Sequence, residues 1–327
     1  MSFAARLVLT ALLLPIVAVA ACGGGDSGAE PQSSGWRALR SAPLERTEVG
    51  AARIGDSIYV VGGFLPPDTT TAAVERFDIT RNRWQRLGPM PIAVNHPAVA
   101  ALDGYLYVYG GYTDSSFGPV TGALQRFDPR KGRWRQLPPS PSPRAAAALA
   151  ARDGKLYAVG GTFAGALTTL EVYDVEQRRW LPAPPMATPR EHLAAVATGA
   201  GVYVLGGRDN GTELATAERF DPATRRWSRL PDLGTPRSGF VAVAVAGRPL
   251  VFGGEELDSG GSTIEEVEIF APGQRRWRSL PSMLTPRHGL GGVVQGRRVY
   301  AVEGGPSPGL AFSDAIEVLA VPPAALR

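Results

Sequence analysis

Five arginines recur at a nearly constant distance ahead of a pair of glycines, and their guanidinium groups could together bind an anion. Four of them lie sixteen residues before a Gly-Gly pair, and the fifth lies seventeen residues before one. They are Arg46, Arg144, Arg190, Arg237 and Arg287. Guanidinium groups that converge favour a carboxylate, a phosphate or an acidic peptide loop. The same regularity also fits a structural role, in which each arginine donates hydrogen bonds to carbonyl groups of its own or the next repeat.

Two carboxylates near these arginines could take part in acid–base chemistry. Glu191 directly follows Arg190, and Glu303 precedes the last glycine pair, where we align it with apolar residues of the other repeats. A buried carboxylate must be paired or have a raised pKa, so Glu303 is expected to form a salt bridge with a neighbouring arginine. The candidate catalytic residues are Arg190, Arg237, Glu191 and Glu303. No nucleophile elbow, phosphate-binding loop or zinc motif accompanies them, so the sequence favours binding over catalysis.

The elements that would position these residues come from a sixfold repeat. An apolar stretch ends in Gly-Gly six times, and each of the six tryptophans precedes such a pair by 26 or 27 residues. A third mark, such as Glu75-Arg76-Phe77-Asp78, begins nine residues before the next tryptophan. Each repeat divides into four short strands separated by turn residues such as Asp103-Gly104. Four antiparallel strands in every repeat are typical of a propeller blade.

The glycine pair, the aromatic residue after Glu-Arg and the tryptophan at fixed spacing closely resemble the Kelch motif, over residues 36–327. The resemblance implies an all-β, six-bladed Kelch propeller with four antiparallel strands in each blade. It also implies that the glycines allow close packing and that the aromatic residues fill the space between blades, in line with the properties of these residue types.

The two ends of the chain predict how the propeller closes. A tryptophan would be due at position 326, but Leu326 stands there and the chain ends one residue later. The missing fourth strand is supplied by Trp36-Arg37-Ala38-Leu39 at the other end. We therefore expect the N-terminal strand to complete the last blade.

The three histidines, His96, His192 and His288, are candidates for ligand binding on the same face as the arginines. His96 and His192 are at equivalent positions two blades apart, and His288 lies one residue out of that register. A metal ion would need three ligands at about 2 Å, whereas residues two blades apart should be separated by much of the channel. Although Glu48 and Glu191 are nearby, we expect no metal site and no cofactor.

Cys22 is the only cysteine and ends a segment that reads as an export signal. Arg6 precedes an apolar run over residues 7–20 that is too short to span a bilayer permanently. Val19-Ala20-Ala21-Cys22 resembles the lipobox of bacterial lipoproteins, which implies that the Cys22 thiol is lipidated and the signal is cut before it. We expect a signal over residues 1–21 and a lipidated cysteine with a flexible tether over residues 22–35. The alternative is an ordinary secretory signal with an incidental cysteine.

These features predict a lipid-anchored binding scaffold on the periplasmic or extracellular face of a bacterial membrane. The loops between second and third strands vary most in length, which suits a recognition surface on a rigid framework. The expected partner is a protein, an anionic small ligand or a glycan, and the chain is expected to be a monomer. The net charge of +4 gives no reason to expect nucleic acid. The alternative is an envelope enzyme resembling a sialic acid mutarotase. Copper chemistry of the galactose oxidase kind is not expected, because it needs a cysteine bonded to a tyrosine and the only cysteine, Cys22, is the predicted lipidation site.

Overall fold

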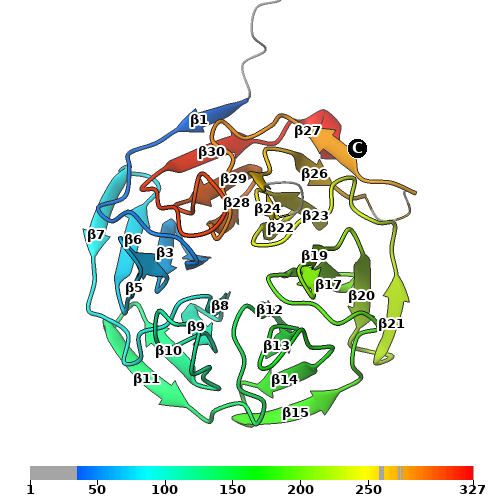
Figure 1. Cartoon of the computed structure of the whole chain (residues 1–327), viewed down its shortest axis with the longest axis horizontal. Coiled ribbons are helices and arrows are strands. Elements are labelled where there is room, and N and C mark those ends of the chain that lie inside the picture. Colours follow the sequence, from blue (N-terminus) through cyan, green and yellow to red (C-terminus); the bar gives the residue numbers. More distant parts are fainter. Residues whose placement is uncertain (1–34, 258–260, 272, 274, 327) are drawn as a thin grey trace, which may run out of the picture. The chain divides into compact units, whose positions relative to one another are not determined.

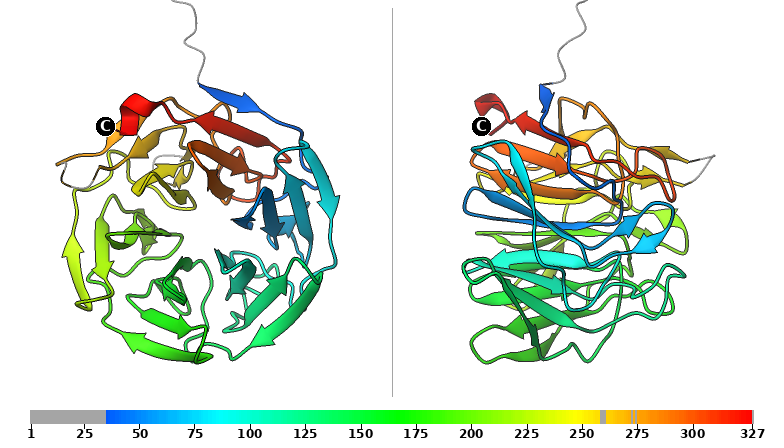
Figure 2. Two further views of the ribbon diagram at one scale, coloured as in Figure 1. Left: turned by 180° about the vertical axis from the view of Figure 1, so that it is seen from behind. Right: turned by 90° about the vertical axis from the view of Figure 1, so that its left-hand side faces the viewer.

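The computed structural model describes residues 35–257, 261–271, 273 and 275–326. The predicted signal, Cys22 and nearly all of the tether lie outside these residues. Within them, the strands form six four-stranded antiparallel sheets arranged as blades around a central axis (Figures 1 and 2). The all-β, six-bladed prediction is therefore confirmed. No helix in the described ranges is long and apolar enough to cross a membrane.

Each blade contains four strands, and in blades 1 to 5 they follow one another in sequence order from the axis outward (Figure 1). Blade 1 contains β2 (Gly50–Ile54), β3 (Ser57–Val61), β6 (Val74–Asp78) and β7 (Arg83–Arg86), and blade 2 contains β8 (Ala98–Leu102), β9 (Tyr105–Tyr109), β10 (Leu124–Asp128) and β11 (Arg133–Leu137). Blade 3 contains β12 (Ala148–Arg152), β13 (Lys155–Val159), β14 (Leu170–Asp174) and β15 (Arg179–Ala183), and blade 4 contains β16 (Ala194–Thr198), β17 (Gly201–Leu205), β20 (Ala217–Asp221) and β21 (Arg226–Arg229). Blade 5 contains β22 (Val241–Val245), β23 (Arg248–Phe252), β26 (Val267–Ile269) and β27 (Arg278–Leu280).

Blade 6 is built from both ends of the described chain. Its inner strands are β28 (Gly291–Gln295), β29 (Arg298–Val302) and β30 (Ile316–Ala320), and its outer strand is β1 (Trp36–Ala38). Trp36 pairs with Leu319 and Ala38 pairs with Glu317 in an antiparallel register. The predicted closure of the last blade by the N-terminal strand is confirmed.

Short two-stranded ribbons extend some of the connections between second and third strands. They are β4 (Phe64–Leu65) with β5 (Thr69–Thr70), β18 (Arg208–Asp209) with β19 (Thr212–Glu213), and β24 (Glu255–Glu256) with β25 (Ser262–Thr263). A 3-10 helix (Pro323–Leu326) follows β30. Because strands alternate in direction, these connections share one face of the propeller with the connections between blades. We call it the loop face.

Six apolar clusters fill the spaces between neighbouring blades. The cluster between blades 1 and 2, for example, joins Val61 and Val74 to Leu106 and Phe127. In blades 1 to 4, the third-strand aromatic pairs with the fourth-strand tryptophan, with ring centroids 5.0–5.2 Å apart. In blade 5, Phe270 and Trp277 lie just outside the paired strands, and their ring centroids are 5.2 Å apart. Burial of the apolar side chains in these six clusters stabilises the fold, and with a single cysteine the chain has no internal disulfide to add to it.

Candidate functional site

The five recurring arginines lie inside their blades, and none of their side chains is exposed. Each forms a salt bridge with a carboxylate on the third strand of its own blade: Arg46–Glu75 (3.0 Å), Arg144–Glu171 (2.9 Å), Arg190–Glu218 (2.6 Å), Arg237–Glu268 (2.8 Å) and Arg287–Glu317 (3.4 Å). Several also donate to carbonyl groups of the glycine pair, as Arg190 does to Gly206 at 3.0 Å. These contacts match the structural alternative. A role in ligand binding stays a prediction, and these contacts do not support it.

The partner carboxylates were the residues that the sequence argument missed, although the sequence holds a signal for them. Blade 2 has Val94 in place of the arginine and Gln125 in place of the carboxylate. In the structure, the two changes occur together in blade 2. Val94 is buried and apolar, and the amide of Gln125 forms hydrogen bonds with the backbone of Ile92 where the other blades have an ion pair. The joint loss of both charges in one repeat identifies the ion pair.

Glu303 is a second carboxylate on Arg46, contributed by blade 6. Its Oε2 lies 2.9 Å from Arg46 Nε, and its Oε1 accepts from Arg46 Nη2 at 3.0 Å. The alignment of Glu303 with apolar second-strand residues was wrong by one position. Glu303 has a φ of 55°, close to the 66° of Gly62, and its N–H donates to Ala315 as that of Gly62 does to Ala73. It therefore replaces the first glycine of the pair, which explains the extra residue counted in blade 6.

Burial raises the pKa of Glu303 to about 7, although Arg46 lowers it. Burial also raises the pKa of Glu75, the other carboxylate on this guanidinium. One arginine between two buried carboxylates cannot compensate both charges, so one proton is retained more readily than in the unfolded chain.

The contribution of Glu303 to folding stability is therefore expected to fall as pH rises from 4.5 toward 7, while the lowered pKa of His96 acts in the opposite direction in part of the same range. In this window the unfolded chain has released the Glu303 proton while the folded chain still binds it. Glu303→Gln should remove about 1–3 kcal/mol of this decline, measured by urea unfolding followed through tryptophan fluorescence between pH 5 and 8. The exposed Glu266→Gln should keep the wild-type profile; an unchanged profile in Glu303→Gln would contradict the assignment.

Six residues at equivalent positions, one from each blade, surround the axis at the loop face. They are Glu48, His96, Ala146, His192, Gly239 and Gly289, and all have a φ between 49° and 61°. Each of the last five donates its N–H to the carbonyl of the one before it, and Val49 completes the circle by donating to Gly289, with all six bonds between 2.8 and 3.2 Å. We call this closed circle of backbone hydrogen bonds the axial ring. It brings one residue from every blade to the propeller axis.

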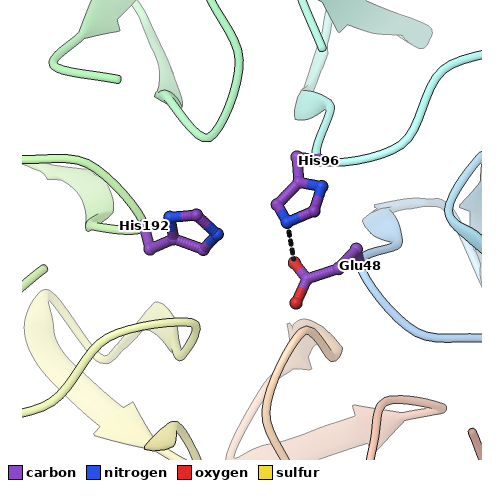
Figure 3. Close-up of side chains that lie close together, drawn as sticks. All are labelled: Glu48, His96 and His192. Carbon is purple, nitrogen blue, oxygen red and sulfur yellow. Dashed lines mark ion pairs between the residues drawn. The ribbon is translucent and has the colours of Figure 1, made fainter. Parts of the chain in front are cut away.

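His96 and His192 meet across the axial ring, so their expected separation by much of the channel was wrong. Their ring centroids lie 4.9 Å apart in an edge-to-face arrangement. Figure 3 shows both side chains and that of Glu48 pointing toward one centre, with His96 Nε2 3.3 Å from Glu48 Oε2. Ala146, between the two histidines in the ring, has no side chain long enough to separate them.

The third histidine and two loop residues surround this centre. His288 Nδ1 lies 3.3 Å from Glu48 and 3.4 Å from Glu255. Arg208 contacts Glu191 at 2.7 Å and Glu255 at 3.3 Å. Of the four candidate catalytic residues, Glu191 alone belongs to this group. Arg208 and Glu255 lie in second-to-third connections, where no repeat mark identified them in the sequence.

The ionisation of this group follows from burial and from its neighbours. Burial lowers the pKa of His96 to about 4, although Glu48 opposes the shift. Burial alone would raise the pKa of Glu48, but His96 and His288 outweigh it and hold this pKa well below the usual range. Burial alone would also raise the pKa of Glu191. His192 and Arg208 outweigh this effect and lower the pKa of Glu191 to about 2. At neutral pH the group therefore holds ionised carboxylates beside a neutral His96.

A cavity of about 200 Å³ lies above this centre on the loop face. Its polar lining includes Glu48, His96, His192, Arg208, Glu255 and His288, and its apolar lining includes Phe64, Phe117, Leu257 and Leu310. Within the described residues, five large hydrophobic side chains are exposed: Phe117, Phe163, Leu257, Leu284 and Leu310. All five lie in connections of the loop face, so this face combines a charged central cavity with an apolar rim.

Comparison with known proteins supports the same architecture. Residues 31–188 match the family described as the KLHDC2/KLHL20/DRC7 Kelch-repeats domain, and residues 189–234 match the Kelch motif. The chain is 35% identical over 113 residues to the Kelch-like protein terF of Aspergillus terreus, covering 32% of this chain and 24% of that protein. It is 32% identical over 87 residues to Kelch-like protein 15 of Danio rerio, covering 27% of this chain and 14% of that protein. These matches thus span about a quarter or less of the relatives' length.

A solved structure, titled "Structure of YjhT", is similar to this chain with a TM-score of 0.74. The sequence identity is 16%, and the similarity covers 85% of this chain and 95% of that one. At this level of identity the comparison supports the propeller fold alone.

Proposed function

The chain belongs to the Kelch-repeat family, and from this premise we propose that it is an exported, lipid-anchored, monomeric scaffold that binds a protein partner through its loop face. Kelch domains serve as binding scaffolds. Cys22, at the end of an export-signal pattern, would carry the lipid and keep the propeller at a bacterial membrane surface.

The gathering of exposed hydrophobic side chains around the central cavity is the observation that carries this proposal. Phe117, Leu257 and Leu310 line the cavity with 52%, 39% and 46% of their surface exposed. Exposed apolar residues gathered on one face, beside a concave polar centre, are typical of a protein interaction surface. Large aromatic anchors on such a surface contribute most of the binding energy.

The charges of the cavity bear on the kind of group that the partner inserts. Glu48, Glu191 and Glu255 surround the centre, and Arg208 already lies between two of these carboxylates. An anionic ligand or an acidic glycan would have this one guanidinium to bind it. We therefore favour a partner loop with apolar and basic side chains over the anionic ligand expected from the sequence.

The enzymatic alternative, a sialic acid mutarotase-like activity, finds less support in this geometry. Arg190 and Arg237 are buried in salt bridges of their own blades, and Glu303 is buried against Arg46. Glu191 is the one candidate catalytic residue beside the cavity, and it is bound by Arg208.

Site-specific photo-crosslinking in cells that produce the full chain tests the proposal. A benzophenone side chain at Phe117, Phe163 or Leu310 should yield one common adduct, whereas the same group at the exposed positions Lys131 and Glu176 on the opposite face should not. Phe117→Ser combined with Leu310→Ser should remove the adduct formed from position 163. Fractionation of the same cells should place the wild type in the membrane fraction and Cys22→Ala outside it. Adducts without preference between faces, or membrane association unaffected by Cys22→Ala, would contradict the corresponding part of the proposal.

A further inference from the structure

We propose that Glu48, His96 and His192 form a binding site for a divalent transition metal ion at the propeller axis. One ligand atom from each of the three side chains lies within 4.8 Å of the others. The pair of His96 Nε2 and Glu48 Oε2 is 3.3 Å apart, and ligand bonds of 2.0–2.2 Å in a tetrahedral site require about this separation. His192 has its ligand atom within 4.8 Å of both, so the three side chains need to close around an ion to reach ligand distances. This inference does not depend on the proposed protein partner.

The neighbours of His96 fix the ring so that its Nε2 can serve as the ligand atom. The amide nitrogen of Asn95 donates to Thr70 Oγ1 at 2.7 Å and to the Asp114 carbonyl at 2.9 Å. A carbonyl can only accept, so the amide oxygen of Asn95 must be the atom that faces His96 Nδ1 at 2.6 Å. Nδ1 then carries the proton and donates to Asn95. The lone pair of the neutral ring is left on Nε2, beside Glu48.

His192 has the second interaction that is usual for a metal-binding histidine. Its Nδ1 lies 3.3 Å from Glu191 Oε2, and Glu191 is in turn held by Arg208 at 2.7 Å. Figure 3 shows the other ring nitrogen of His192 pointing toward Glu48 and His96. A carboxylate behind the histidine orients the ring and makes it a stronger ligand. Both histidines thus have a hydrogen-bond acceptor on the side away from the proposed ion.

The backbone conformation at these three positions is strained for any residue with a side chain. Glu48, His96 and His192 have φ values of 53°, 51° and 49°, in the left-handed region where glycine is preferred. Two other blades have glycine at this position, Gly239 and Gly289. Glycine is therefore compatible with the axial ring, and histidine or glutamate there is strained. Strain of this kind is concentrated at functional sites.

Charge and access also suit a divalent ion. Three carboxylates, Glu48, Glu191 and Glu255, lie around the centre with one guanidinium, that of Arg208, so negative charge is in excess. Arg208 Nη2 lies 3.4 Å from His192 Nε2 and must move away from that atom when the ion binds, while its Nε can stay on Glu191. Imidazole and carboxylate donors match Zn²⁺ and its neighbours in the transition series. The cavity of about 200 Å³ above the centre leaves a position for water or another small ligand. Three protein ligands with one open position resemble catalytic zinc sites more than closed structural ones.

The axial ring itself provides matched variants for the test. Glu48→Gly, His96→Gly and His192→Gly each replace a proposed ligand by the residue that blades 5 and 6 already have. Ala146→Gly makes the same backbone change at the same kind of position and removes no ligand. The full chain, purified in detergent, is titrated with ZnCl₂ alone by equilibrium dialysis and elemental analysis. CoCl₂ alone is followed by visible absorption, which reports the coordination geometry. Thermal unfolding shows that each variant is folded.

We expect one equivalent of Zn²⁺ in the wild type and in Ala146→Gly, and at least about tenfold weaker binding in the three ligand variants. Co²⁺ should give visible bands typical of four-coordinate nitrogen and oxygen ligands in the first two proteins only. Wild-type affinity weaker than about 1 mM, wild-type-like binding by folded His96→Gly and His192→Gly, or loss of binding in Ala146→Gly would overturn the proposal.

Discussion

Replacing Arg46 by methionine is expected to lower the free energy of unfolding by about 3–5 kcal/mol. The guanidinium is fully buried and contacts both Glu75 and Glu303, so its removal leaves two carboxylates without a cation in the interior. Methionine fills much of the vacated space, and the loss therefore reports the uncompensated charge more than a cavity. Urea unfolding followed by tryptophan fluorescence measures the change.

Two further variants separate charge from packing at this position. Arg37→Met changes an exposed arginine on β1 and should shift the free energy of unfolding by no more than about 0.5 kcal/mol. Arg46→Met combined with Glu75→Gln and Glu303→Gln removes the buried negative charges and should recover part of the loss. A loss below about 1 kcal/mol in Arg46→Met, or no recovery in the triple variant, would show that the buried cation is not required.

Trp36→Ala is expected to destabilise the propeller by about 3–5 kcal/mol and to loosen blade 6 first. Trp36 is 6% exposed, packs on Phe252 with centroids 5.8 Å apart, and donates its indole N–H to the Pro281 carbonyl at 3.0 Å. These contacts join the N-terminal strand to blade 5, in addition to its pairing with β30 in blade 6. Without them, the outer edge of β30 loses its partner strand.

Hydrogen exchange distinguishes loss of closure from general destabilisation. In Trp36→Ala, amides of β30 should lose protection before those of β10, which is central in blade 2. Trp84→Ala is the comparison, because Trp84 is only half-buried and its blade is continuous in sequence; it should cost less and should not expose β30 selectively. Equal effects of both variants on β30 would contradict a special role of the N-terminal strand.

The fold could be predicted from the sequence because each blade repeats the same packing requirement. The spacing from the acidic mark to tryptophan is set by the hairpin that pairs the third and fourth strands, as Phe77 pairs with Trp84. Because the same pattern occurs six times, the number of blades could be counted directly from the sequence. The absence of a tryptophan near Leu326 and the presence of Trp36 identified the exchanged strand.

The site could be predicted only in part, because its geometry depends on contacts between repeats. The histidines were expected to stand apart, but the axial ring brings equivalent residues of different blades to one centre. Glu303 was aligned one position out of register, since a glutamate in the left-handed conformation of a glycine has no mark in the sequence. The carboxylate partners of the arginines were visible only through the joint change at Val94 and Gln125.

The axial ring has a consequence for how such proteins can diversify. Its bonds join peptide groups and involve no side chain, so the identity of the six encircling residues is decoupled from the closure of the circle. Glutamate, histidine, alanine and glycine already share one backbone arrangement there. Different members of a lineage could therefore exchange the chemistry presented at the symmetry axis, one blade at a time, while inheriting an unaltered architecture.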